Sequence, residues 1–131
     1  MEATQINKLV QSQRHFFLTG TTLDVNVRID ALKKLYSAIK KHENEIFDAL
    51  NKDLGKSQFE SYMCEVGLTL SEISYMIKHI RTFSKEKNVP TPLAQFHSRS
   101  FKKPSPRGVV LIMSPWNYPF LLTMEPLVDA I

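Results

Sequence analysis

The sequence predicts an α/β fold, in which a mostly helical first part leads into one strand and one helix of a parallel sheet. Residues 109–113, between Gly108 and Pro115, form an unbroken apolar run rich in β-branched side chains. Such a run is typical of a strand buried on both faces of a sheet. Before residue 84, apolar residues recur every three or four positions, which is the spacing of helices that bury one face.

Four helical regions follow from this spacing, and most begin or end at a residue suited to a helix terminus. Asp24 can cap the second region, and Gly55 can end the third. Ser57 and Glu60 have the spacing of a capping box at the start of the fourth, within which the pattern allows a break at residues 65–67. The four regions are residues 3–17, 24–41, 43–54 and 57–83.

Residues 85–106 follow a different rule and are predicted to form a linker and an exposed β-arm. Pro90 and Pro92 interrupt the helical pattern, and residues 95–104 alternate weakly with few apolar side chains, which predicts one or two exposed strands. The arm carries charges that protect an exposed strand edge from pairing. They are Arg99, Lys102 and Lys103. We therefore divide the chain at this arm into residues 1–84 and 107–131.

A rigid turn joins the predicted strand to the last predicted helix, which runs to Ile131. Pro115 and Pro119 fix backbone angles and remove amide donors, so neither a strand nor a helix passes through them. Ligands of open α/β sheets bind at the carboxyl ends of strands, which makes this turn the candidate site. Asn117 offers an amide that can donate to an oxygen carrying developing negative charge. An Asn between two prolines can equally bond its own backbone in a turn.

The composition excludes several other classes of protein. Residues 1–10 are polar and mixed, so no signal peptide is visible, and no apolar run is long enough to span a bilayer. The single cysteine, Cys64, excludes an internal disulfide and suits a reducing compartment, so we expect a cytoplasmic protein. Cys64 lies among the packing positions of a predicted helix, and we interpret it as an inert core residue. The four histidines are dispersed, so we expect no metal site.

The sequence around the turn resembles the aldehyde dehydrogenase superfamily, and its Asn-Tyr-Pro-Phe form is most similar to the class 3 branch. The resemblance implies a Rossmann-like, incomplete cofactor domain and an enzyme that oxidises an aldehyde to a carboxylate with NAD or NADP. It also implies that the arm joins two subunits of a homodimer. The residues that carry it are Pro106-x-Gly108-Val109-Val110 and then Pro115-Trp116-Asn117-Tyr118-Pro119-Phe120.

The resemblance implies roles for individual residues. Asn117 would donate its side-chain amide to the oxyanion that forms when a cysteine thiolate attacks the aldehyde to give a thiohemiacetal. Tyr118 would border the aldehyde channel. The family's nucleophilic cysteine and glutamate base lie beyond Ile131, so we expect this chain alone to be inactive. The positions that would line the nicotinamide side of the cofactor cleft are Met113, Ser114, Pro115 and Trp116.

Two functions of other classes are compatible with the residues. Residues 4–83 could form a helical interaction module without enzymatic activity, with the apolar last helix as its docking element. The chain has a formal net charge of +4, and its basic cluster at residues 99–107 could bind an acidic partner. No nucleic-acid motif accompanies that cluster, so we expect no nucleic-acid partner.

Overall fold

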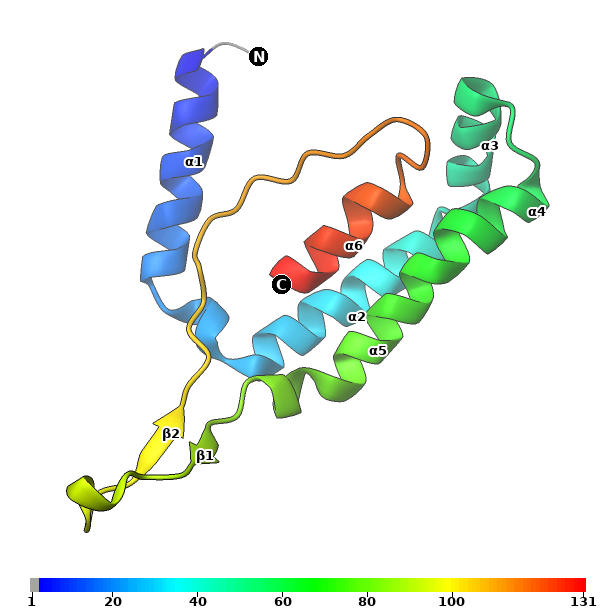
Figure 1. The fold of residues 1–131 in the computed structure, drawn as a ribbon. Helices are drawn as coiled ribbons and strands as arrows, with labels where there is room; N and C mark the ends of the chain where they lie inside the picture. Colours follow the sequence, from blue (N-terminus) through cyan, green and yellow to red (C-terminus); the bar gives the residue numbers. More distant parts are fainter. Residues whose placement is uncertain (1–2) are drawn as a thin grey trace.

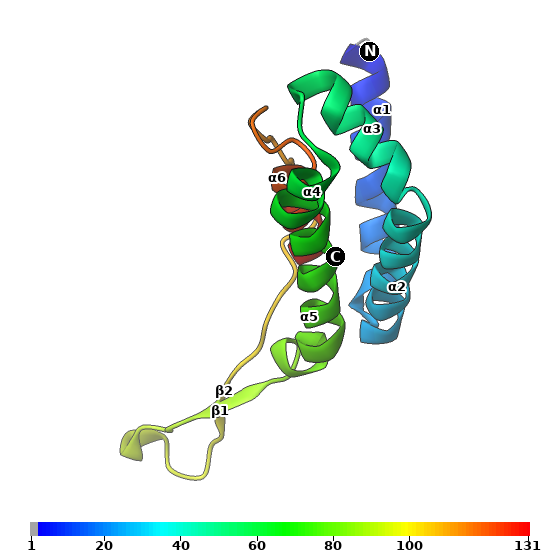
Figure 2. The ribbon, with the colours of Figure 1, turned by 90° about the vertical axis from the view of Figure 1, so that its right-hand side faces the viewer.

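The computed structural model describes residues 3–131, in which helices form the body and a two-stranded arm extends away from them (Figures 1 and 2). The helices are α1 (Ala3–Leu18), α2 (Val25–Lys41), α3 (Glu43–Leu54), α4 (Gln58–Ser61), α5 (Gly67–Phe83) and α6 (Leu121–Ala130). The arm pairs β1 (Lys87–Val89) with β2 (Ser100–Lys102). Short 3-10 turns are η1 (Thr21–Leu23) and η3 (Leu93–Gln95), and η2 (Tyr62–Val66) is a π-helix.

The core lies where α2, α5 and α6 meet. Helices α2 and α5 run side by side, and α6 packs against α5 and η2 (Figure 1). Leu32 of α2, Ile73 of α5 and Val128 of α6 are fully buried in one cluster. Helix α1 contributes no buried residue, although its sequence carries an apolar stripe with Ile6 and Leu9. The stripe of α1 therefore stays uncovered within the described chain.

The predicted helices and their capping residues are confirmed. The Asp24 carboxylate accepts a hydrogen bond from the Asn26 backbone N–H at 2.8 Å, at the start of α2. The Ser57 hydroxyl accepts from the Glu60 N–H at 3.1 Å, at the start of α4. Gly55 ends α3 with a φ of 67°, which glycine adopts without steric cost.

The break that the sequence allowed at residues 65–67 is the end of the π-helix η2. The Gly67 N–H donates to the Tyr62 carbonyl five residues earlier, which is the bond that defines a π turn. A Cβ on Gly67 would lie 2.8 Å from that carbonyl oxygen, so only glycine fits without a backbone shift. The extra residue of the π turn brings Glu65 and Val66 into the interior together, and neither has any exposed surface.

The strand predicted over residues 109–113 is wrong for the described chain. These residues are extended but unpaired, and Leu111 and Met113 are 82% and 84% exposed. A parallel strand needs neighbouring strands to take its backbone N–H and C=O groups. Within residues 3–131 the sheet consists of β1 and β2 alone, which lie in the arm. Of the one or two exposed strands predicted within residues 95–104, β2 is present there. Its antiparallel partner β1 lies earlier, before Pro90, in the stretch predicted as linker, with Asn88 opposite Phe101.

No helix in the described part of the chain combines the length and the apolar character needed to cross a membrane.

We expect Gly67→Ala to lower the free energy of unfolding by about 1 kcal/mol. Alanine normally gains about 1 kcal/mol over glycine inside a helix, but overpacking against the Tyr62 carbonyl costs roughly 1–3 kcal/mol. Chemical unfolding followed by circular dichroism measures the change. Ser71→Ala, at an exposed position of α5, is the control and should be neutral or stabilising. A stabilised Gly67→Ala variant would contradict the π turn.

The carboxyl of Glu125 on α6 is predicted to make stability depend on pH. Burial raises its pKa above the usual 4.5, and the Glu72 and Asp129 carboxylates raise it further. The folded chain therefore retains this proton at pH values where the unfolded chain has lost it. Stability attributable to this group is full below pH 4.5 and falls as the pH rises through the raised pKa.

Replacing Glu125 by Gln should consequently stabilise the chain at neutral pH and have little effect below pH 4.5. We expect a small rise in the midpoint of thermal unfolding at neutral pH, measured by calorimetry across a pH series. Asp30→Asn removes an exposed carboxylate from α2 and should show no such pH-dependent gain. An equal gain for Glu125→Gln at both pH values would argue against the raised pKa.

Candidate functional site

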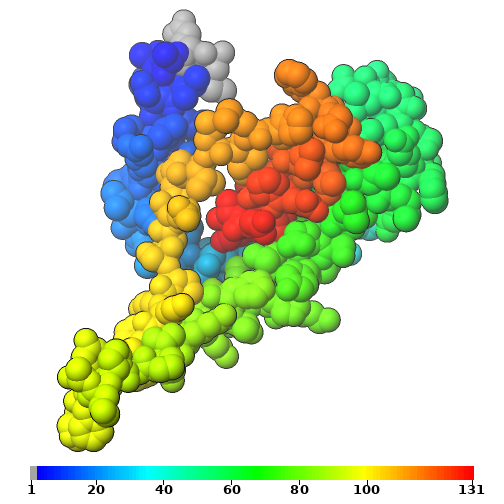
Figure 3. All heavy atoms as spheres, viewed as in Figure 1, coloured from blue at the N-terminus to red at the C-terminus, as the bar shows by residue number. Residues whose placement is uncertain are grey.

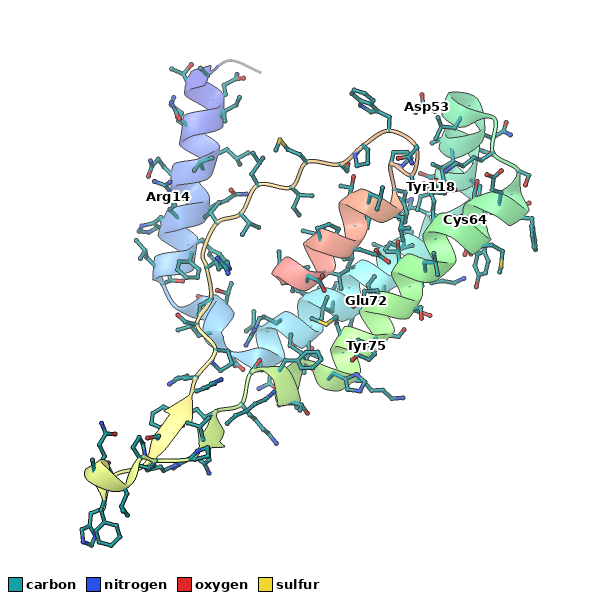
Figure 4. All side chains as sticks on the ribbon, viewed as in Figure 1. Arg14, Asp53, Cys64, Glu72, Tyr75 and Tyr118 are labelled. Atoms are coloured by element: carbon teal, nitrogen blue, oxygen red, sulfur yellow. The ribbon has the colours of Figure 1, made fainter. Side chains whose placement is uncertain are left out.

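The predicted turn lies between the extended segment and α6, beside the π-helix. In Figure 3 the extended segment crosses the surface as orange atoms above the red atoms of α6. Figure 4 places Tyr118 of the turn and Cys64 of η2 at the same end of the helical body. The candidate site is therefore formed by two stretches that lie more than fifty residues apart in the sequence.

A buried ion pair lies directly beneath this turn. Lys56, in the loop that joins α3 to α4, donates through Nζ to the carboxylate of Glu65 in η2. Lys56 is 7% exposed and Glu65 is fully buried. Charged side chains are almost never buried to this degree unless they are paired, so each of these two residues depends on the other.

The ammonium of Lys56 also holds the turn itself. Its Nζ donates to the backbone carbonyl of Asn117 at 2.8 Å. The same Nζ lies 3.9 Å from the centroid of the Tyr118 ring, a cation–π contact. An ammonium has three protons to donate, and here a carboxylate, a carbonyl and an aromatic face surround it.

The second oxygen of Glu65 holds the start of α6. Its Oε2 accepts from the backbone N–H of Phe120 at 2.9 Å and of Leu121 at 3.2 Å. The first N–H groups of a helix have no partner within the helix, and Phe120 provides no side-chain cap for α6. A carboxylate at this position also interacts favourably with the helix dipole. Glu65 is thus the N-terminal cap of α6, supplied from another element.

Asn117 lies at the exposed outer side of the held turn. Its side-chain amide has no hydrogen-bond partner in the described part of the chain, and its carbonyl is bound by Lys56. The expectation that a buried strand leads into Asn117 is wrong, because no sheet lies beneath the turn within residues 3–131. The amide is free to meet a ligand, and its backbone is fixed by Lys56 instead of by a sheet.

The other predicted site residues lie along the same exposed segment and do not converge on a pocket. Met113 and Trp116 are 84% and 87% exposed, and Pro115 is exposed as well. Ser114 is half-buried and its hydroxyl shares a hydrogen bond of 2.6 Å with Thr123 of α6. Tyr118 is half-buried against Lys56.

Neither Cys64 nor a cluster of metal-binding side chains forms a second candidate site in the described part of the chain. Cys64 is a half-buried free thiol in η2. Among residues 3–131, no group of three His, Cys, Asp or Glu side chains is placed to hold a metal ion.

Sequence reasoning missed Lys56 and Glu65. A signal existed for Glu65, because it stands directly before Val66 in a helical stretch where the apolar face is expected, and a carboxylate there requires a partner. No signal identified Lys56, which follows Gly55 and resembles the basic residues that commonly follow a helix end.

Comparison with known proteins identifies the family. Residues 1–131 match the sequence profile of the aldehyde dehydrogenase family. The chain belongs to the aldehyde dehydrogenase family. The resemblance inferred from the turn motif is thereby confirmed.

Two named relatives and a solved structure agree with the family. The chain is 44% identical over 126 residues to 4,4'-diaponeurosporen-aldehyde dehydrogenase of Staphylococcus aureus, covering 96% of this chain and 28% of the relative. It is 39% identical over 129 residues to the dimeric NADP-preferring aldehyde dehydrogenase of Canis lupus familiaris, covering 98% and 28%. A solved structure described as the substrate-bound state of Staphylococcus aureus AldH superposes with a TM-score of 0.91 at 42% identity.

The solved structure confirms the predicted fold class, and it confirms that this chain contains only part of that fold. The match covers 99% of this chain and 28% of the solved one. The chain therefore has the aldehyde dehydrogenase fold over a mostly helical segment and spans about 28% of the length of the relatives it matches.

Lys56 and Glu65 should be strongly coupled in stability. Lys56→Met leaves a buried carboxylate without its cation, and breaking a buried pair in this way typically costs about 3–5 kcal/mol of the free energy of unfolding. The double variant Lys56→Met/Glu65→Gln removes both charges and should recover a large part of that loss. Urea unfolding of the two single variants and the double variant measures the coupling.

Lys40→Met is the matched control, since Lys40 pairs with Glu43 at 2.9 Å on the surface of the same helical body. It should cost much less than Lys56→Met, because exposed ion pairs contribute little to stability. Losses that simply add in the double variant would mean that the two buried side chains act independently.

Proposed function

We propose that the chain forms part of an enzyme that oxidises an aldehyde to a carboxylate with NAD or NADP. The family match over the whole chain supports this reaction class. The observation that carries a role within this segment is the unpartnered amide of Asn117 on a turn whose backbone is held by Lys56. An oxyanion donor must be free to bind and already in place before charge develops.

The proposed chemistry assigns Asn117 a single task. A cysteine thiolate from elsewhere in the full-length enzyme adds to the aldehyde carbon, and the carbonyl oxygen becomes an oxyanion of the thiohemiacetal. The Asn117 amide donates a hydrogen bond to that oxygen and stabilises the charge until hydride leaves the carbon. The pair of prolines around Asn117 limits the conformations of the turn, so little reorganisation is needed during the reaction.

The segment before the turn offers groups that suit a dinucleotide. Residues 109–116 exchange no backbone hydrogen bonds with other described residues, so their N–H and C=O groups are available. Met113 and Trp116 add exposed apolar surface on which a flat ring can pack. With Ser114 and Pro115 they would line the cofactor, and Tyr118 would border the aldehyde. A bound NAD or NADP supplies the hydride acceptor.

Further features of the proposed enzyme rest on the arm and on the relatives. The arm, with Leu93 and Phe96 exposed at its tip, would join two subunits, in keeping with the dimeric form named for the canine relative. That name also favours NADP as one usable cofactor. The single cysteine supports a cytoplasmic location.

Replacing Asn117 by Ala in the full-length enzyme should lower kcat by about 10²–10³-fold, which is the usual effect of removing one oxyanion donor. KM should change little, because the lost bond forms mainly in the transition state. Formation of NADH or NADPH with a range of aldehydes measures both constants. Asn44→Ala, at an exposed position of α3, is the control and should retain activity.

The 131-residue chain alone should produce no reduced cofactor, because it spans only about 28% of the length of its relatives and the family resemblance assigns the cysteine nucleophile and the glutamate base to the remaining part. Turnover by that chain above the buffer rate would contradict the proposal. So would an Asn117→Ala enzyme with an unchanged kcat.

A further inference from the structure

We propose that Lys56 and Glu65 are positioning residues that hold the backbone of the turn and so fix the place from which the Asn117 amide reaches a substrate oxygen. They reach the turn from two different elements, the loop after α3 and the π-helix η2. We call the two side chains and their contacts the clamp. This inference rests on the proposed function, since it concerns how the oxyanion donor is placed.

The clamp holds both sides of the turn. Lys56 binds the carbonyl of Asn117, and Glu65 binds the N–H groups of Phe120 and Leu121. The carbonyl of Asn117 belongs to the peptide plane that follows this residue, so the bond from Lys56 restrains that plane and the Cα from which the side chain extends. The bonds to Glu65 fix where α6 begins, four residues later at Leu121. The backbone between these points has little freedom left.

The segment on the other side of Asn117 provides no comparable restraint. Residues 109–116 make no backbone hydrogen bonds to the rest of the described chain, and most of their side chains are exposed. Ser114 does share a hydrogen bond with Thr123, but Thr123 belongs to α6, and Glu65 holds the start of that helix. This contact is therefore not independent of Glu65. Beyond the backbone angles that Pro115 and Pro119 fix, the position of Asn117 within the described chain therefore depends on the clamp.

Stability alone does not account for a buried ion pair at this place. Well-packed apolar side chains of similar volume are often as stable as a buried pair, because desolvation of both charges offsets their attraction. Apolar side chains cannot, however, direct a carbonyl and two N–H groups. Each clamp residue combines the ion pair with directional bonds to the turn, which is what a geometric role requires.

The π-helix explains how Glu65 reaches the turn. The wide turn ending at Gly67 places Glu65 in the interior directly beside Val66, with both side chains fully buried. Single π turns within α-helices occur frequently at functional sites. Here the π turn places the Glu65 carboxylate where it binds the first N–H groups of α6. The same carboxylate pairs with Lys56, which in turn binds the Asn117 carbonyl.

The kinetic test is a cycle between the clamp and Asn117 in the full-length enzyme. Lys56→Met should lower kcat by about 10–100-fold with little change in KM, because a small misplacement of a catalytic group costs on this order. In an Asn117→Ala background the same change should cost less than about threefold, since no amide remains to be positioned. Equal costs in both backgrounds, or a wild-type kcat for Lys56→Met, would overturn the inference.

Controls separate positioning from failure to fold. The Lys40→Met enzyme, which loses an exposed pair, should keep its kcat. If Lys56→Met does not fold, the near-isosteric Glu65→Gln enzyme takes its place in the same cycle, with the same expected and contradicting outcomes. Lys56→Arg retains a cation near the Asn117 carbonyl and should recover part of the activity lost in Lys56→Met.

A second measurement tests the clamp without turnover. In the 131-residue chain, Glu65→Gln should speed amide hydrogen exchange at Phe120 and Leu121 by roughly tenfold or more, because a bond to an ionised acceptor is replaced by a weaker one. Glu60→Gln, on the exposed side of α4, should leave both amides unchanged. Unchanged exchange in Glu65→Gln would overturn the clamp. A wild-type enzyme without aldehyde oxidation would instead overturn the proposed function, with amide exchange still deciding the clamp.

Discussion

The ion pair between Lys56 and Glu65 connects the helical body to the turn that carries Asn117. Two buried charges are tolerated when hydrogen bonds compensate for their lost hydration, and the turn supplies such bonds through one carbonyl and two N–H groups. The dependence is therefore mutual. The helices need the turn to satisfy their buried charges, and the turn needs those charges because no sheet supports it within the described chain.

Much of the helical body could be predicted from the sequence because its causes are local. Helix boundaries depend on capping residues a few positions away, such as Asp24 and Ser57, and on the spacing of apolar side chains. The interruption before Gly67 was also visible, although its form as a π turn was not. The π turn buries Glu65, and a buried carboxylate is stable only beside its partners Lys56 and the start of α6. Those partners belong to other elements, so a local sequence pattern does not reveal them.

The predicted strand failed because strand formation is a property of pairs of segments. Residues 109–113 have the composition of a buried strand, but their backbone groups find no partner within residues 3–131. Asn117 could be proposed from the motif, whereas Lys56 could not, since nothing near position 56 indicates that its ammonium meets a carbonyl sixty-one residues later. Contacts over such separations become visible only in the folded structure.

The unpaired apolar segment also bears on how the chain behaves in concentrated solution. Its row of free N–H and C=O groups can accept another extended segment, and its β-branched side chains suit the close stacking of such additions. Intermolecular β-augmentation is therefore the natural route to aggregation for molecules in this conformation. The charged arm residues Arg99 and Lys102 disfavour the same event at β2, so residues 109–113 are where association would begin.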